Sequence, residues 1–239
     1  MAIAWIVTVV FLASLIQSLS GFGFAMIIMR LATIVVGLQT AAPMVALTAL
    51  TIYSINVVRY RRAIDLGEAL RLGIASALGV PVGIWVLTNV NETLVKQAMG
   101  VILIAYAAYA LARPTTSWMP SRYWVFPAGF LAGCLSGAYN APGPPLILYG
   151  SLRRWPRDEF RAILQAIFFV NGALVVSSHL IAHRVTVEVL TLFFCALPVL
   201  ILGISVGSRV DRLVAGKRFR IIVISLVGVM GLALALGLG

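Results

Sequence analysis

The sequence predicts an all-α polytopic membrane protein, because of its composition, its long apolar runs and the placement of its charges. Hydrophobic residues make up 62% of the chain and charged residues 10%, and the mean hydropathy is +1.05. Soluble domains average about 25% charged residues. The 239 residues have room for seven or eight membrane spans of about 20 residues. We therefore expect a single integral membrane domain over residues 1–239, without an extramembrane domain.

Eight apolar segments follow one another along the chain, separated by short polar links. They cover, to within a few residues, 2–29, 40–58, 69–88, 93–112, 122–151, 160–182, 187–207 and 219–238. Aromatic side chains stand at several segment ends, as in the aromatic belts of membrane proteins: Trp118, Tyr123, Trp124 and Trp155. The first segment begins without a basic stretch, so we do not expect a cleaved signal peptide.

The first and fifth segments are each interrupted by the tripeptide Leu-Ser-Gly. It opens LSGFGFAM in the first segment and LSGAYNAPGPPL in the fifth. Glycine and proline interrupt helices, and an interruption exposes backbone polar groups. Such groups are tolerated at membrane depth only where protein or a water-filled cavity satisfies them. We call residues 18–24 the first break and residues 136–145 the second break. Matching breaks in two halves point to the binding site of a transporter.

The two halves of the chain are predicted to be repeats, about 1–112 and about 120–239. Ser20 and Ser136 begin the two Ser-Gly pairs and lie 116 residues apart. The glycine pair at 79 and 83 is matched 124 residues later by the pair at 203 and 207. Glycines four residues apart also occur simply for close helix packing. The repeat prediction therefore rests on the order of all the segments.

The distribution of Lys and Arg favours re-entrant first and fifth segments. Eight simple crossings would divide these residues seven against eleven between the two sides. If the first and fifth segments are hairpins, only Arg30, Lys96 and Arg184 of the 18 bases lie outside. That division fits the positive-inside rule and makes the two halves inverted relative to each other. The alternative for the fifth segment is a tilted, broken full span, because few residues separate Pro145 from Arg153.

The two breaks supply the candidate substrate site. A helix that restarts near mid-membrane presents free N–H groups and the positive end of its dipole, and two such ends facing each other would suit a small anion. The candidate binding residues are Gln17, Ser20, Gly21, Gly23, Ser136, Gly137, Asn140, Gly143, Pro144, Pro145, Gln165 and Asn171. Each has an alternative role. The glycines could serve packing, the serines could bond to their own helices, the prolines could be architectural, and the amides could join helices.

The acidic residues are expected to lie in links or at segment ends. They are Asp65, Glu68, Glu92, Asp158, Glu159, Glu188 and Asp211. Many ion-coupled carriers use carboxylates within the membrane, so the sequence argues against a cationic substrate and against coupling through a buried acid. No metal or cofactor motif is present in the sequence, and Cys134 and Cys195 lack metal-ligand spacing. The net charge of +11 lies in short clusters that topology explains, so no nucleic-acid partner is expected.

The segment GFLAGCLSGAYNAPGPPLILYG (129–150) resembles the second-half signature of the TauE/SafE family of sulfite exporter-like membrane transporters. The glycine-rich first segment, the basic link RYRRAIDLGEAL and the eight-segment duplication are also similar. The first segment differs in that Phe22 and Phe24 stand between its glycines and Arg30 follows, where many members have a denser glycine run and a proline. The resemblance implies outward transport of sulfite, organosulfonates or related sulfur anions across the bacterial plasma membrane.

Three classes of function remain at this point. The first is a secondary transporter or facilitator that exports a small anion by alternating access between its two halves. The second is an intramembrane enzyme, which would need a base beside a nucleophile, although Ser136 has no histidine near it in the sequence. The third is a membrane scaffold or assembly protein with a degenerate transport site. The expected partners are a small anionic substrate and the lipid bilayer.

Overall fold

In the computed structural model, the described residues fold mainly into α-helices. The structure describes residues 2–89, 121–139, 142–212 and 216–237, together with isolated positions between 97 and 111. Its helices are α1 (Ala2–Ser20), α2 (Phe24–Tyr60), α3 (Leu66–Asn89), α5 (Val125–Tyr139), α6 (Gly143–Leu152), α7 (Arg157–Ile181), α8 (Val187–Arg212) and α9 (Gly216–Ala235), with short 3-10 turns at Arg61–Ala63 and Arg122–Trp124. The described residues contain no strand, which confirms the predicted all-α class.

Within the described residues, four helical stretches are long and apolar enough to cross a membrane. They are Ile3–Ser20, Leu31–Ala63, Arg157–Ile181 and Val187–Asp211. Most of the predicted fourth segment, 93–112, lies outside the described residues. The exact series of eight segments in two inverted repeats therefore stays a prediction.

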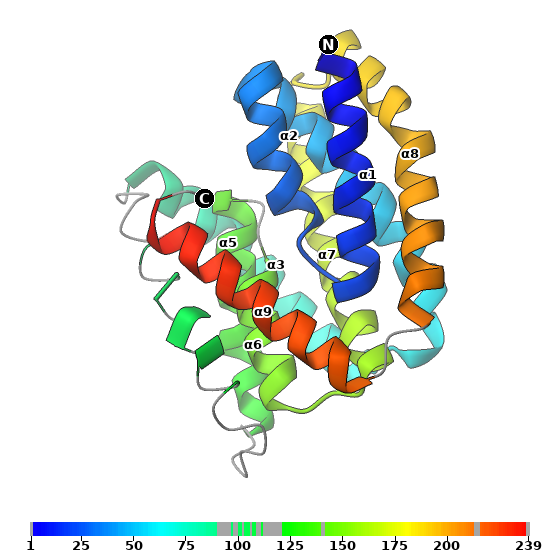
Figure 1. The fold of residues 1–239 in the computed structure, drawn as a ribbon. Coiled ribbons are helices and arrows are strands. Elements are labelled where there is room, and N and C mark those ends of the chain that lie inside the picture. The colour runs from blue at the N-terminus through cyan, green and yellow to red at the C-terminus, as the bar shows by residue number, and fades with distance from the viewer. Residues whose placement is uncertain are drawn as a thin grey trace. The chain divides into compact units, whose positions relative to one another are not determined.

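The first predicted segment is broken, as the sequence indicated. The chain leaves α1 at Ser20 and starts α2 at Phe24, and Figure 1 shows the first part of α2 returning alongside α1. A second irregularity divides α2 at Gly37, where φ is 74°. The first segment is thus a helical hairpin of α1 and residues 24–36, and residues 38–60 form a separate helical stretch.

The fifth predicted segment is also broken. It consists of α5, with 15 residues, and α6, with 10 residues. At about 1.5 Å per residue, α6 spans about 15 Å, which is half the thickness of a hydrocarbon core of about 30 Å. Helix α6 alone therefore cannot cross a membrane, and it packs back against α5.

The helices group into two compact units that do not coincide with the two halves of the sequence. The first unit contains residues 1–69 and 161–213, and the second contains residues 70–160 and 214–239. Each unit therefore combines helices from both predicted repeats. The first break lies in the first unit and the second break in the second unit.

Glycines of α8 allow close packing on α1 in the first unit. A Cβ atom added to Gly203 would lie 2.6 Å from the Cβ of Ser14, and one added to Gly207 would lie 2.7 Å from the Cβ of Ser18. Real Cβ atoms do not approach so closely, so larger residues at 203 or 207 would push the helices apart. The packing of α1 on α8 holds one arm of the hairpin.

The second unit contains the matching arrangement between α3 and α5. A Cβ on Gly79 would overlap the carbonyl oxygen of Phe130, and one on Gly83 would overlap that of Cys134. Phe130 and Cys134 follow Ser14 and Ser18 at the same 116-residue offset that separates the two Ser-Gly pairs. The glycine pairs themselves are related by the 124-residue offset. These reciprocal contacts support the predicted repeat.

Candidate functional site

Two glycines shape the turn of the first break. Gly21 has φ of 86° and Gly23 has φ of 100°, conformations that side chains with a Cβ rarely adopt. A Cβ on Gly21 would also lie 3.1 Å from Cγ of Arg161. The phenylalanines between and after these glycines, Phe22 and Phe24, are buried in the core of the first unit. The positions at which this segment differs from a denser glycine run are therefore occupied by phenylalanines that pack in the core of the first unit.

A network of buried amides holds the turn. Gln17 Nε2 donates to the Gly21 carbonyl (3.2 Å), and Gln17 Oε1 accepts from the Phe24 N–H (3.1 Å), so one side chain joins both sides of the break. Gln165 on α7 donates to the same Gly21 carbonyl at 2.7 Å. Gln165 Oε1 accepts from Asn56 of α2 at 3.2 Å. Gln17 and Gln165 thus brace the break through hydrogen bonds, and their contact with a substrate stays a prediction.

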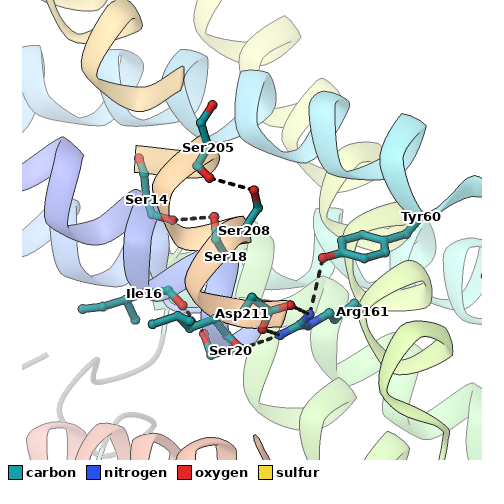
Figure 2. Close-up of polar contacts among 10 residues, drawn as sticks. Ser14, Ile16, Ser18, Ser20, Tyr60, Arg161, Ser205, Ser208 and Asp211 are labelled. Carbon is teal, nitrogen blue, oxygen red and sulfur yellow. Dashed lines mark hydrogen bonds and ion pairs between the residues drawn. The ribbon is translucent and has the colours of Figure 1, made fainter. Parts of the chain in front are cut away.

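The hydroxyl of Ser20 is also used within the break. Ser20 Oγ lies 2.7 Å from the carbonyl oxygens of both Ile16 and Phe22, and it accepts from the Phe22 N–H at 3.2 Å. Figure 2 shows Ser20 beside Ile16 at the end of α1. The side chain therefore completes hydrogen bonds that the end of a helix would otherwise leave unmade.

Arg161 of α7 forms a buried ion pair with Asp211 of α8 (Figure 2). The contact is bidentate, and its Nη2 to Oδ1 distance is 2.7 Å. The same guanidinium donates to the Leu19 carbonyl at the end of α1 and to the Tyr60 hydroxyl at 3.4 Å. Arg161 therefore connects the end of α1, where the first break begins, to α2, α7 and α8.

Two of the acidic residues lie at helix ends, as the sequence predicts, but are buried in the protein. Asp211, the second-last residue of α8, is 6% exposed, and Glu68, in the first turn of α3, is 5% exposed. The sequence interpretation treated Arg161 as one more cytoplasmic base. Its position four residues before Gln165, on the same helical face, was the available signal that it lies in the interior.

The helices that surround the first break contact it near their ends. The sequence predicts a break near the middle of the membrane. Tyr60 is the last residue of α2, and Asp211 is the second-last residue of α8. Gln165 lies eight residues after the start of α7, which corresponds to about 12 Å along the helix. The helices that hold the break therefore contact it within about three turns of their ends, and not at their midpoints.

The second break joins α5 to α6. Pro142 precedes α6, whose first residues, Gly143, Pro144 and Pro145, are all buried. Prolines have no N–H group, so Gly143 alone supplies a backbone donor among residues 142–145. The start of α6 therefore offers fewer donors than an ordinary helix N-terminus. Asn140 lies outside the described residues, and Gly137 is half-buried near the end of α5.

Ser136 and Asn171 complete the predicted set. Ser136 is 1% exposed, and its hydroxyl oxygen has no hydrogen-bond partner. Asn171 is buried on α7, six residues beyond Gln165. In the described part of the chain, no three His, Cys, Asp or Glu side chains come together as metal ligands. Whether the two breaks face each other stays a prediction.

Broken apolar helices with buried polar groups at the breaks define a polytopic membrane protein of the transporter type. Residues 6–234 match the family model described as sulfite exporter TauE/SafE. The chain therefore belongs to the TauE/SafE family, and the resemblance inferred from the second-break signature is confirmed. It is a multi-pass membrane transporter of the sulfite exporter type, for which a small anionic substrate and membrane lipids are the implied partners. Searches of curated proteins and of solved structures find no significant match.

Proposed function

We propose that this protein exports a small sulfur-containing anion, sulfite or an organosulfonate, across a bacterial plasma membrane by alternating access. The observation that carries the proposal is the pair of helix breaks at matched positions of the sequence, in a chain that belongs to the sulfite exporter family. Broken helices place backbone and side-chain polar groups where a small ligand can use them.

The buried ion pair beside the first break is compatible with export driven by the membrane potential. Arg161 and Asp211 neutralise each other, so this buried pair adds no net charge next to the first break. An inside-negative membrane potential then acts on the charge of the substrate. Outward movement of a monovalent anion gains about 2.3 kcal/mol per 100 mV. Export would therefore need no further ion, although coupling to one is compatible with the same site.

Proteoliposome flux tests the proposed function directly. The purified protein is reconstituted, the vesicles are loaded with sulfite, methanesulfonate, sulfate or chloride, and efflux is measured with and without an imposed inside-negative potential. We expect efflux of sulfite or methanesulfonate that exceeds protein-free vesicles and increases with the potential. Movement of a cation without movement of any anion would contradict the proposal, and flux of no tested solute would favour the scaffold alternative.

A further inference from the structure

Ser20 and Ser136 occupy equivalent positions in the predicted sequence repeat, yet their hydroxyls differ in their contacts. Both residues precede a glycine, and they are 0% and 1% exposed. Ser20 Oγ has contacts with Ile16 and Phe22. Ser136 Oγ has none. The sequence predicts the same role for both serines. The difference in the contacts of their hydroxyls is visible only in the structure.

The usual behaviour of hydroxyls on these helices makes Ser136 exceptional. Buried hydroxyls at Ser14, Ser18 and Thr48 each donate to the carbonyl four residues earlier, at 2.6 to 2.9 Å. Ser136 also lies in a helix, α5, and could donate to the carbonyl four residues earlier, but it does not form this hydrogen bond. Among the described residues, it is the one buried hydroxyl oxygen without a partner. A buried unsatisfied donor is rare in native proteins because it loses its bonds to water without replacement.

We infer that the two breaks have different roles, and that the Ser136 hydroxyl donates a hydrogen bond to an oxygen atom of the transported anion. The polar groups of the first break bond to one another and to Arg161, so this break is an anchor. The second break retains a free donor for the substrate. This inference rests on the proposed function and names which break recognises the ligand.

The small number of donors among the described residues of the second break also indicates the charge of the substrate. Gly143 supplies the one N–H among residues 142–145, and Ser136 supplies one hydroxyl. An anion that leaves water needs donors or cations to replace its hydration, and a second charge greatly increases that need. We therefore expect a singly charged oxyanion, such as a sulfonate, to be preferred over divalent sulfate.

Matched serine variants test the division of roles. Ser136→Ala and Ser20→Ala are compared in full-length protein for methanesulfonate efflux and for thermal unfolding in detergent. We expect Ser136→Ala to raise KM about tenfold, as the loss of a hydrogen bond to a charged group would, without lowering Tm. Ser20→Ala should lower Tm and leave KM within about twofold. Ser136→Cys, which has a similar size and is a weak donor, should raise KM like the alanine variant.

Several results would overturn the inference. They are an unchanged KM for Ser136→Ala, equal KM changes in the two alanine variants, or loss of folding in both Ser136 variants, which would make that hydroxyl structural. A preference for sulfate over methanesulfonate would overturn the expected substrate charge. If Ser20→Ala does not fold, Ser14→Ala serves as the structural comparison. If the unmodified protein moves no anion, the proposed function itself fails, which distinguishes the two failures.

Discussion

Arg161 connects four helices of the first unit through one guanidinium group. It belongs to α7 and contacts Asp211 of α8, the Leu19 carbonyl of α1 and the Tyr60 hydroxyl of α2. Burying a charge is costly unless it is paired and hydrogen-bonded. The three contacts satisfy that requirement, and they also fix the end of α1 where the first break begins.

Removing one partner of the buried pair should strongly destabilise the first unit. Asp211→Ala would leave the Arg161 guanidinium buried without a counter-charge, and we expect a loss of about 3–5 kcal/mol in the free energy of unfolding. The double variant Arg161→Met with Asp211→Leu should recover much of this loss. Unfolding in detergent measures both effects, and Arg184→Ala, which removes an exposed base, is the control. Equal stabilities of Asp211→Ala and Arg184→Ala would show that the pair contributes nothing.

At the scale of the elements, each break depends on a different local device. The first uses glycines with positive φ, whereas the second uses a Gly-Pro-Pro sequence that starts a short helix. Both breaks could be predicted because glycine and proline act locally. The contacts of Gln17 with Gln165 and of Arg161 with Asp211 could not be predicted, because these partners lie 148 and 50 residues apart in the sequence and are brought near only by packing.

Two glycines with positive φ, Gly21 and Gly37, allow the effect of backbone strain to be separated from an effect on function. Gly21→Ala and Gly37→Ala would each place a Cβ in a left-handed conformation, at a cost of about 1–2 kcal/mol. Gly37 has no other atoms within 4 Å of such a Cβ, whereas Gly21 faces Arg161. We expect Gly37→Ala to retain anion efflux and Gly21→Ala to lose most of it. The two variants are compared by anion efflux per amount of folded protein, and size-exclusion chromatography measures that amount. Equal efflux by the two variants would argue against a role for the first break.

At the scale of the whole molecule, neither half of the chain can build a complete unit by itself. Helix α1 of the first half packs on α8 of the second half, and α3 of the first half packs on α5 of the second half. The sequence showed the repeat through Ser20, Ser136 and the two glycine pairs. It did not show this exchange, because a repeat in sequence does not specify which copies pack together. The buried glycine contacts supply that missing information.

The last prediction concerns membrane topology. The arrangement with two hairpins and the arrangement with eight simple crossings place the link that contains Arg62 on opposite sides of the membrane. If the first and fifth segments are hairpins, the link that contains Arg62 lies in the cytoplasm, whereas eight simple crossings that leave both termini outside also leave this link outside. In a chain with Cys134 and Cys195 replaced by Ala, we expect Arg184→Cys to react with a membrane-impermeant maleimide in intact cells. Arg62→Cys, which is equally exposed on the protein, should react only after the membrane is permeabilised. Labelling of Arg62→Cys in intact cells would exclude the re-entrant first segment and the inverted halves that follow from it.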